Sequence, residues 1–341
     1  MPRLLTLALV LLLLAACEPG GVMAPSVTGE PETRGWPEAG EPITATEPAE
    51  DDGEPPQIDG GGREAEAPHS EVGVGLEVVF LDVGQGDATL VRVGEATLLV
   101  DTGRHDRRDL PGLLADQEVT AIDVVAVTHP HADHLGQFDA VLEGFDVDEV
   151  WFSPADHDTL TFERALDALE AADVAYAEPS AGEIYDIGDV VVEVVGPDEA
   201  ADPDDLHDSG LVLRAGTGGA SVLFTGDVEE ATERRLVAGP HADWLDADLY
   251  QVGHHGSATS TSPPFLAAVD PEIAVVSYGP GNPYGHPHAE VLERLEAAGV
   301  DLYGTGAHGT VTARHGPAGW SVTTDHGGQV RPGGEEDDDE R

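Results

Sequence analysis

Three histidines and an aspartate lie within six residues of one another. Residues 128–136 read Thr-His-Pro-His-Ala-Asp-His-Leu-Gly and follow an apolar run typical of a buried strand. Neutral imidazole and carboxylate groups are good ligands for Zn²⁺ and similar ions. Side chains two apart on an extended segment point the same way, so His129 and His131 can bind one ion. Asp133 and His134, where the chain turns toward a helix, can reach a second. The spacing predicts a two-metal centre and disfavours a polar loop with chance histidines.

Two divalent ions at such a centre indicate hydrolytic chemistry. Held ~3.5–4 Å apart, they share a hydroxide whose pKa is lowered toward neutrality, so no protein nucleophile is needed. The sequence agrees, because Cys17 is its only cysteine and no Gly-x-Ser-x-Gly elbow occurs in the folded part. We expect two divalent ions as cofactors. Imidazole-rich sites favour Zn²⁺, and the aspartates also admit Mn²⁺.

The elements that must position these ligands form one domain, which we place at residues 73–326. Helical periodicity occurs at 162–171, 229–237 and 289–298. Early antiparallel strands, interspersed helices and a second strand set indicate an α+β sandwich, with two sheets face to face and helices outside. Apolar runs, many separated by short Gly and Asp turns, predict strands at 76–81, 88–93, 96–100, 122–127, 190–195, 211–215, 221–224, 249–252 and 273–276.

The His-x-His-x-Asp-His motif resembles the signature of the metallo-β-lactamase superfamily, and further landmarks of that superfamily follow in order. The resemblance implies an αββα sandwich of two mixed β-sheets with helices on the outer faces. It implies that Asp101, in Leu-Val-Asp-Thr-Gly, supports the metal loop without binding metal. It also implies that Asp227, in Phe-Thr-Gly-Asp, bridges the two ions. His254 or His255 is the late histidine ligand, and we favour His254 because it follows the strand more directly.

Longer motifs resemble the hydrolase domain of ComEC-type competence proteins, which serve DNA uptake. These motifs are Phe-Leu-Asp-Val-Gly-Gln-Gly-Asp at 80–87, His-His-Gly-Ser at 254–257 and Asn-Pro-Tyr-Gly-His-Pro-His at 282–288. The strand pair expected within 209–227 is similar too, so the resemblance covers roughly residues 76–324. It implies phosphodiester hydrolysis, with nucleic acid as one source of the diester. Because the acidic chain lacks the basic track that a duplex binder uses, we expect a small or short diester as substrate.

The resemblance also assigns roles around the metal ions. It makes His286 a proton donor near the substrate; the alternative is a loop that approaches a helix with a proline near its first turn. It places the 80–87 motif at the rim of the metal site, and a Gly-rich turn between two strands is an equal alternative. The rim or substrate residues implied are Asp82, Gln85, Asp87, His255 and Ser257.

Three departures from the ComEC pattern bear on function. The only long apolar run is at the N-terminus, so the membrane channel of that family has no counterpart, which argues against DNA transport. His207 occupies a position where the family often has Asn, and imidazole is the better transition-metal ligand. We therefore predict His207 as a ligand, with a solvated loop histidine as the alternative. Ala258 replaces a residue that tends to be basic.

The combined interpretation is a metal-dependent hydrolase that favours phosphodiesters. An esterase or lactonase of the same fold is one alternative. A non-catalytic surface binding lipoprotein is the other, disfavoured because a scaffold has no need of every ligand. We expect Asp133, Asp227 and His286 to be catalytic. The predicted metal ligands are His129, His131 and His207 for one ion, Asp133, His134 and His254 for the other, and Asp227 between them.

The N-terminus predicts export and a lipid anchor. Arg3 precedes an apolar run at 4–16, too short to span a bilayer and typical of a secretory signal. The run ends Leu-Ala-Ala-Cys at Cys17, which resembles a lipobox; an ordinary signal with an incidental cysteine is the alternative. We expect a signal peptide at 1–17, lipidation of Cys17 and a place on the outer face of the cell membrane. An acidic Pro/Gly-rich linker at 18–72 and an acidic tail at 327–341 are predicted to be disordered.

The charge of the chain is one-sided. Its formal net charge is −52, and every basic residue other than histidine is arginine. Molar salt shortens the Debye length to ~3 Å and would screen this repulsion, so the composition suggests a salt-rich habitat. It argues against a broad basic groove for nucleic acid. No protein partner can be inferred.

Overall fold

The computed structural model describes residues 75–106 and 109–333. These residues lie within one compact unit, Arg34–Arg341. The predicted signal peptide with Cys17, the linker and the end of the acidic tail lie outside the described residues. None of the helices in the described part of the chain has the length and apolarity that a membrane crossing requires.

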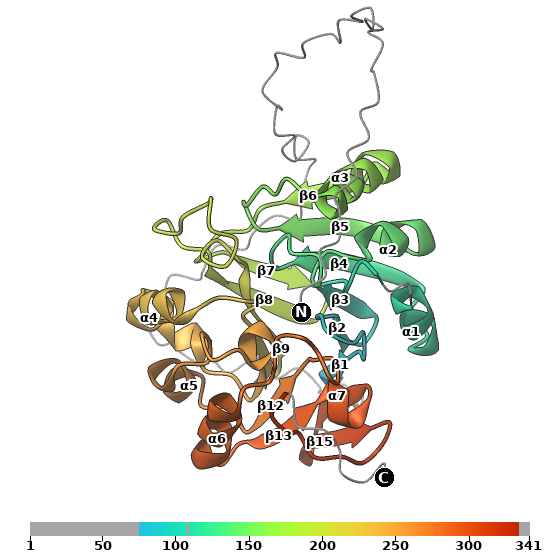
Figure 1. The fold of residues 1–341 in the computed structure, drawn as a ribbon. Coiled ribbons are helices and arrows are strands. Elements are labelled where there is room, and N and C mark those ends of the chain that lie inside the picture. The colour runs from blue at the N-terminus through green and yellow to red at the C-terminus, as the bar shows by residue number, and fades with distance from the viewer. Residues whose placement is uncertain (1–74, 107–108, 334–341) are drawn as a thin grey trace, which may run out of the picture. The chain divides into compact units, whose positions relative to one another are not determined.

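Eight strands form the first sheet, in the order β15-β14-β1-β2-β3-β4-β5-β6 (Figure 1). Pairing is antiparallel from β15 to β3 and parallel from β3 to β6. The strands are β1 (Glu77–Phe80), β2 (Thr89–Val93), β3 (Ala96–Val100), β4 (Ala121–Val127), β5 (Asp146–Phe152), β6 (Ala175–Ala177), β14 (Val311–Gly316) and β15 (Gly319–Thr324).

Seven strands form the second sheet, in the order β13-β12-β11-β10-β9-β8-β7. Pairing is antiparallel from β7 to β10 and parallel from β10 to β13. The strands are β7 (Ile184–Ile187), β8 (Val190–Gly196), β9 (Val212–Thr217), β10 (Ala220–Phe224), β11 (Leu249–Gln251), β12 (Ile273–Val276) and β13 (Asp301–Gly304).

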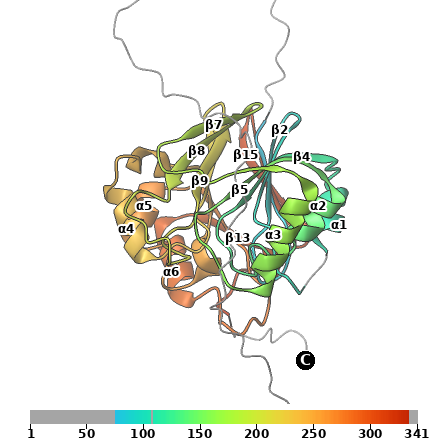
Figure 2. The same ribbon diagram turned by 90° about the horizontal axis from the view of Figure 1, so that it is seen from above.

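Helices cover the outer face of each sheet, so the predicted αββα sandwich is confirmed (Figure 2). Short 3-10 helices, η1 (Ala242–Leu245) and η2 (Gly253–Gly256), and the short helix α7 (Thr305–His308) complete the described elements. On the first sheet lie α1 (Leu110–Asp116), α2 (Phe138–Gly144) and α3 (Leu160–Ala172). On the second lie α4 (Glu230–Ala238), α5 (Pro263–Val269) and α6 (Ala289–Ala298).

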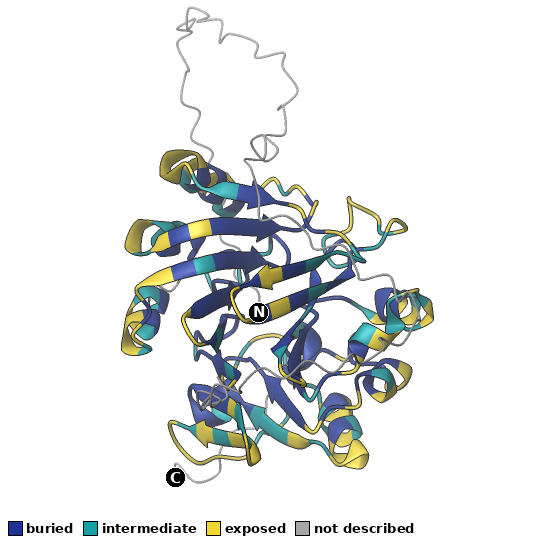
Figure 3. Ribbon diagram, turned by 180° about the vertical axis from the view of Figure 1, so that it is seen from behind, coloured by how far each residue is buried: buried dark blue, intermediate teal, exposed yellow. Residues whose placement is uncertain are grey.

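Strand β4 illustrates why the central strands are apolar throughout. Val124 and Ala126 face the other sheet in the inner core, whereas Val125 and Val127 pack under the helices. Both faces of the strand are therefore buried, and a continuous apolar run is expected for such a strand. Figure 3 shows the same division, with buried sheets and exposed residues on the outer sides of the helices. Because β4 is buried on both faces, the loop that follows its carboxyl end starts from a fixed position.

Candidate metal centre

The predicted ligands come from loops at the carboxyl ends of strands in both sheets. His129, His131 and His134 follow β4, and Asp227 follows β10. The loop after β4 also contacts the segment before β9 in the second sheet, because the carbonyl of Thr128 accepts a 2.8 Å hydrogen bond from the backbone N–H of Leu211. The loops after β4 and β10 converge on one site, where Nε2 of His134 lies 3.2 Å from Oδ1 of Asp227.

One group of ligand atoms contains three of the predicted histidines and the predicted bridging aspartate. It consists of His129, His131, His207 and Asp227. Nε2 of His129 lies 2.9 Å from Nδ1 of His131 and 3.6 Å from Oδ2 of Asp227. The His207 and His131 ring centres are 5.0 Å apart, and the buried Nε2 of His207 has no hydrogen-bond partner among the described residues. His207 therefore faces the group predicted to hold the first ion.

A second group shares Asp227 and contains Asp87, His134 and His255. Nε2 of His134 lies 3.2 Å from Oδ1 of Asp227, and Nε2 of His255 lies 3.9 Å from the same oxygen. Nε2 of His255 is also 3.4 Å from Oδ2 of Asp133. Asp227 thus presents one carboxylate oxygen to each group, which is the arrangement that a bridging ligand requires.

The structure separates the two adjacent histidines of the His-His-Gly-Ser motif. His255 belongs to the second group, whereas His254 belongs to a third group, with His207 and Glu229. Nε2 of His254 lies 3.6 Å from Oδ2 of Asp227, on the side of the first group. Nδ1 of His255 is 3.1 Å from the carbonyl of Ser277, so Nε2 is the nitrogen left to face the second group. Such an outer contact fixes the orientation of ligand imidazoles.

The backbone is strained where these side chains are placed. Both His254 and His255 have φ values of 53°, and Asp101 has a φ of 62°. Residues with side chains seldom adopt the left-handed region, which costs them of order 1–3 kcal/mol each. Gly253 precedes the two histidines, and Gly256 follows them with a φ of 80°. The two successive left-handed residues direct neighbouring imidazoles to different groups.

Four atoms of the second group are suitable ligand atoms for a divalent cation. Each is buried and lacks a hydrogen-bond partner among the described residues. An unpaired buried polar atom costs about 1–3 kcal/mol, so four that converge on one point require a common partner. Carboxylate oxygens mixed with imidazole nitrogens suit Zn²⁺ or Mn²⁺. The atoms are Oδ1 of Asp87, Nε2 of His134, Oδ1 of Asp227 and Nε2 of His255.

Asp101 holds the loop after β4 in place through contacts with Thr128 and His134. Its carboxylate accepts hydrogen bonds from the backbone N–H of Thr128 at 2.7 Å and from the hydroxyl of Thr128 at 2.9 Å. Nδ1 of His134 lies 2.8 Å from the same carboxylate. A proton on Nδ1 leaves Nε2 of His134 directed at Asp227, and such a carboxylate–histidine contact is common behind metal ligands.

Electrostatics differ between the two groups. Burial, assisted by His134, lowers the pKa of His129 well below its usual value and that of His131 to about 4. Burial also opposes the charged form of His255, but Asp87 and Asp227 outweigh it and raise the pKa of His255 to about 9. The pKa of His134 is raised against burial by Asp227 and Asp101. Cation binding to the second group must therefore displace protons.

A cavity of about 360 Å³ opens onto both groups. Of the predicted rim residues, Gln85 and His255 line it, while Asp87 is buried in the second group. The predicted proton donor His286 lines it too. Nδ1 of His286 is buried and unpartnered among the described residues. Burial, together with His255 and His288, lowers the pKa of His286 to about 4. His286 is therefore placed to act on a molecule bound in the cavity.

Two predicted rim residues do not line this cavity. Asp82 uses its carboxylate within its own turn, accepting from the backbone N–H of Gly84 at 3.1 Å, as the turn alternative predicts. The hydroxyl of Ser257 lies 3.1 Å from that of Thr259. Sequence reasoning missed three residues near the ligands. Tyr284 stands inside a quoted motif, Glu229 lies two residues after Asp227, and no sequence signal marks His157.

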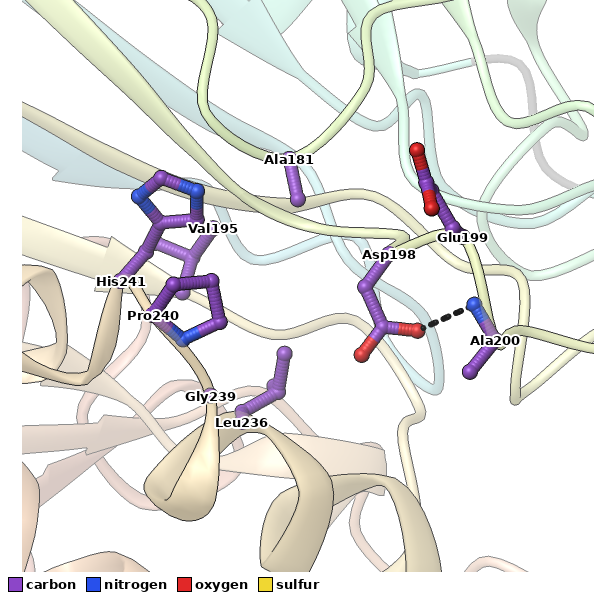
Figure 4. Close-up of a pocket in the computed structure, with 9 residues that line it drawn as sticks. All are labelled: Ala181, Val195, Asp198, Glu199, Ala200, Leu236, Gly239, Pro240 and His241. Carbon is purple, nitrogen blue, oxygen red and sulfur yellow. Dashed lines mark hydrogen bonds between the residues drawn. The ribbon is translucent and has the colours of Figure 1, made fainter.

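A second hollow, of about 350 Å³, lies beside the end of α4 (Figure 4). Its Asp198 accepts a 3.0 Å hydrogen bond from the backbone N–H of Ala200 and pairs with Arg235 at 3.3 Å. Arg235 also binds Asp208, the neighbour of His207, at 2.6 Å. The charged groups there support the segment that carries His207, and the histidine-rich cavity remains the candidate active site.

Comparisons with known proteins identify the family of the chain. The model of the family described as "Metallo-beta-lactamase superfamily" matches residues 81–279. The ComE operon protein 3 of Bacillus subtilis is 30% identical over 259 residues, which cover 70% of this chain and 33% of that protein. Competence protein ComA of Neisseria gonorrhoeae is 33% identical over 237 residues, 69% of this chain and 31% of that protein. The chain thus spans about a third of the length of these curated relatives. Both predicted resemblances are confirmed.

Among solved structures, the metallo-beta-lactamase fold protein YhfI from Bacillus subtilis is similar over 67% of this chain and 96% of its own, with a TM-score of 0.45 and 11% identity.

Proposed function

Because the chain belongs to the metallo-beta-lactamase superfamily, we propose that it is a metal-dependent hydrolase of small or short phosphodiesters. One observation carries the hydrolase assignment: two groups of ligand atoms share Asp227 and open onto one cavity. The preference for phosphodiesters rests on the similarity to competence proteins.

His129, His131 and His207 would hold one ion, and His134, His255 and Asp133 the other, with Asp227 between them. The choice of His255 over His254 revises the expectation from sequence. It is supported by the Ser277 contact and by the 3.4 Å distance from His255 Nε2 to the Asp133 carboxylate. Asp87, in the same group as His255, is a further donor for the second ion.

Two divalent ions supply a nucleophile at neutral pH and neutralise the oxygens of an ester. Three side chains would transfer protons or position the ligands. The lowered pKa of His286 makes it neutral near pH 7, so it would accept the proton that the attacking water loses and pass it to the leaving oxygen. Asp101 keeps the His134 ring oriented, and Arg235 holds the segment of His207 in place through Asp208.

The acidic composition bears on substrate size. With a formal net charge of −52, the chain offers little basic surface to gain affinity for duplex DNA by counterion release. A diester held mainly at the metal centre needs few distant phosphate contacts. We therefore expect short substrates to be preferred and the salt dependence of their hydrolysis to be shallow.

The test is a substrate screen with metal-loaded protein in high salt. We expect turnover of bis(p-nitrophenyl) phosphate and of a dinucleotide, two ions per chain by elemental analysis, and loss of turnover in His131→Ala and Asp227→Ala. If lactones or β-lactams are hydrolysed while every phosphodiester is inert, the substrate assignment is wrong. If two ions bind and none of these substrates reacts, the proposed function fails and the surface binding protein becomes the favoured interpretation.

The proposed enzyme is anchored outside the cell membrane. Support comes from the apolar run at 4–16 that ends at Cys17, the only cysteine. We expect the mature chain to begin at a lipid-modified Cys17 and to partition with membranes. Mass spectrometry of the purified protein decides the matter, since an unmodified Cys17 or a mature terminus downstream of it would contradict the anchor.

A further inference from the structure

We propose that Gln85 is a substrate-binding residue whose side-chain amide donates a hydrogen bond to an oxygen of the bound ester; this rests on the proposed function. Gln85 is only 4% exposed, and it lines the cavity above the metal ligands. Its Nε2 is buried and has no hydrogen-bond partner among the described residues. A buried amide nitrogen left unpaired is costly, so its place beside an open cavity points to a ligand.

The orientation of the amide is fixed by the fold. The backbone N–H of Gly279 donates a 3.1 Å hydrogen bond to Oε1 of Gln85. Rotating the amide by half a turn would set the NH₂ group against that N–H, so the nitrogen must be the end that lacks a partner. The contact needs glycine, because a Cβ on Gly279 would lie 2.8 Å from the backbone nitrogen of Gln85.

One asparagine holds the turn that makes this contact. Nδ2 of Asn282 donates to the carbonyl of Gly279 at 2.9 Å and to that of His286 at 2.6 Å. Its Oδ1 accepts from the backbone N–H groups of Tyr284 and His286, both at 3.1 Å. Asn282 is therefore a positioning residue that sets both the Gln85 amide and the His286 ring at the cavity.

The chemistry of the amide nitrogen defines what it binds. An NH₂ group only donates, so its partner is an acceptor oxygen such as a non-bridging phosphoryl oxygen. It carries no charge and does not titrate, in contrast with the imidazoles and carboxylates of the cavity. Gln85 would hold the substrate oxygen in the same way over the whole pH range of activity.

The experiment compares Gln85→Glu and Gln85→Met in the full, metal-loaded chain. Glu keeps an oxygen for Gly279 and loses the donor; Met loses both. Since a hydrogen bond to a charged acceptor is lost, we expect kcat/KM for bis(p-nitrophenyl) phosphate to fall about 10- to 100-fold in each. Binding of inorganic phosphate, measured by calorimetry, should weaken by a similar factor while two ions per chain remain.

A matched control is Gln137→Met. Gln137 is another buried glutamine, but its Oε1 accepts from the backbone N–H of Leu110 at 3.0 Å and its Nε2 faces Asp109 at 3.5 Å. The variant should be less stable and bind phosphate normally. Asn282→Asp, which retains the acceptor and loses the donor, should lower kcat/KM without loss of metal.

Several outcomes would overturn the proposal. If Gln85→Glu keeps kcat/KM and phosphate affinity within twofold of the wild type, Gln85 serves only to hold Gly279. If either variant binds less metal, and its metal-loaded fraction binds phosphate with the affinity of the wild type, Gln85 supports only the metal site. Wild-type protein that binds phosphate but cleaves no diester would refute the proposed function, while the phosphate affinities of the variants would still decide the role of Gln85.

Discussion

The two oxygens of Asp227 divide the histidines of the centre into two sets. Oδ2 lies 3.6 Å from Nε2 of both His129 and His254, whereas Oδ1 faces His134 and His255. His254 and His255 are adjacent in sequence, and yet they belong to different sides of the centre. The division makes their separate substitution informative.

We expect His255→Ala to lose one of the two ions and most of the turnover, and His254→Ala to retain both ions. The reason is the position of His255 Nε2 beside Asp133 and Asp227. Elemental analysis after dialysis gives the answer. Because the raised pKa of about 9 keeps His255 protonated at neutral pH in the metal-free protein, the affinity for this ion should rise with pH toward 9. The reverse pattern, one ion in His254→Ala and two in His255→Ala, would restore His254 as the ligand.

His207→Asn should weaken the binding of one ion by a measurable factor and leave folding intact. An amide replaces an imidazole whose buried Nε2 faces the first group, and amides are poorer ligands for transition metals. Chelator competition measures the affinity, and circular dichroism checks the fold. Equal affinities in the two proteins would make His207 a bystander.

Helices α4 and α5 are joined by a buried carboxylate. Glu233 of α4 is fully buried and accepts hydrogen bonds from the backbone N–H groups of Thr261 and Ser262, at the start of α5. Burial raises the pKa of Glu233, although these N–H groups favour the charged form. Arg294 of α6 donates to the carbonyl of Thr261. The three helices that cover the second sheet thus meet at one polar contact, in the segment that follows His254 and His255 along the chain.

Glu233→Gln should destabilise the protein by about 1.5–3 kcal/mol, because the glutamine NH₂ faces an N–H and leaves it unpaired. Urea unfolding in high salt measures the loss. The control is Glu230→Gln, which removes an exposed ion pair with Arg234 whose side chains are 61% and 59% exposed. Such a pair contributes little, so a loss in the control equal to that in Glu233→Gln would disprove the special role of the buried contact.

Sequence patterns predicted the elements that are long or apolar. Strand β12 and helix α6 have the predicted bounds, because an unbroken apolar run and regular helical periodicity end at clear turn residues. Helices α1 and α2 were missed, since seven residues are too few for periodicity to be visible. Strand β5 was missed because Asp146, Asp148 and Glu149 interrupt its apolar residues. Strand β15 was also missed. It lies at the edge of its sheet, and its residues alternate between exposed and partly buried.

Spacing alone predicted site geometry only where ligands are close in sequence, whereas the distant Asp227 and His207 were predicted through the family resemblance. The spacing of His129, His131 and His134 indicates the metal centre by itself. The choice between His254 and His255 depends on two left-handed φ values that the sequence does not reveal. The unpaired amide of Gln85 depends on Gly279, which is far away along the chain. Long-range backbone contacts therefore decide what local motifs leave open.

The charge of the whole molecule sets its response to salt. With a net charge of −52, repulsion should weaken the fold at low ionic strength, and molar salt reduces the Debye length to ~3 Å. We expect the thermal midpoint to rise between 0.1 M and 1 M KCl. Sucrose at equal osmolality is the control, because it stabilises without screening. A midpoint that responds equally to both solutes would refute the electrostatic explanation.

Both ligand groups take side chains from loops of both sheets. His129, His131 and His134 follow a strand of the first sheet, and Asp227 follows a strand of the second. Bound ions would therefore link the two halves of the chain, and unfolding would release them. Each tenfold rise in free metal above the dissociation constant should add about 1.4 kcal/mol per site to the free energy of unfolding. Denaturation in buffered metal measures this slope, and a midpoint indifferent to metal would contradict it. Metal starvation would then remove the folded protein as well as its activity, so the abundance of the protein would follow the supply of the ion.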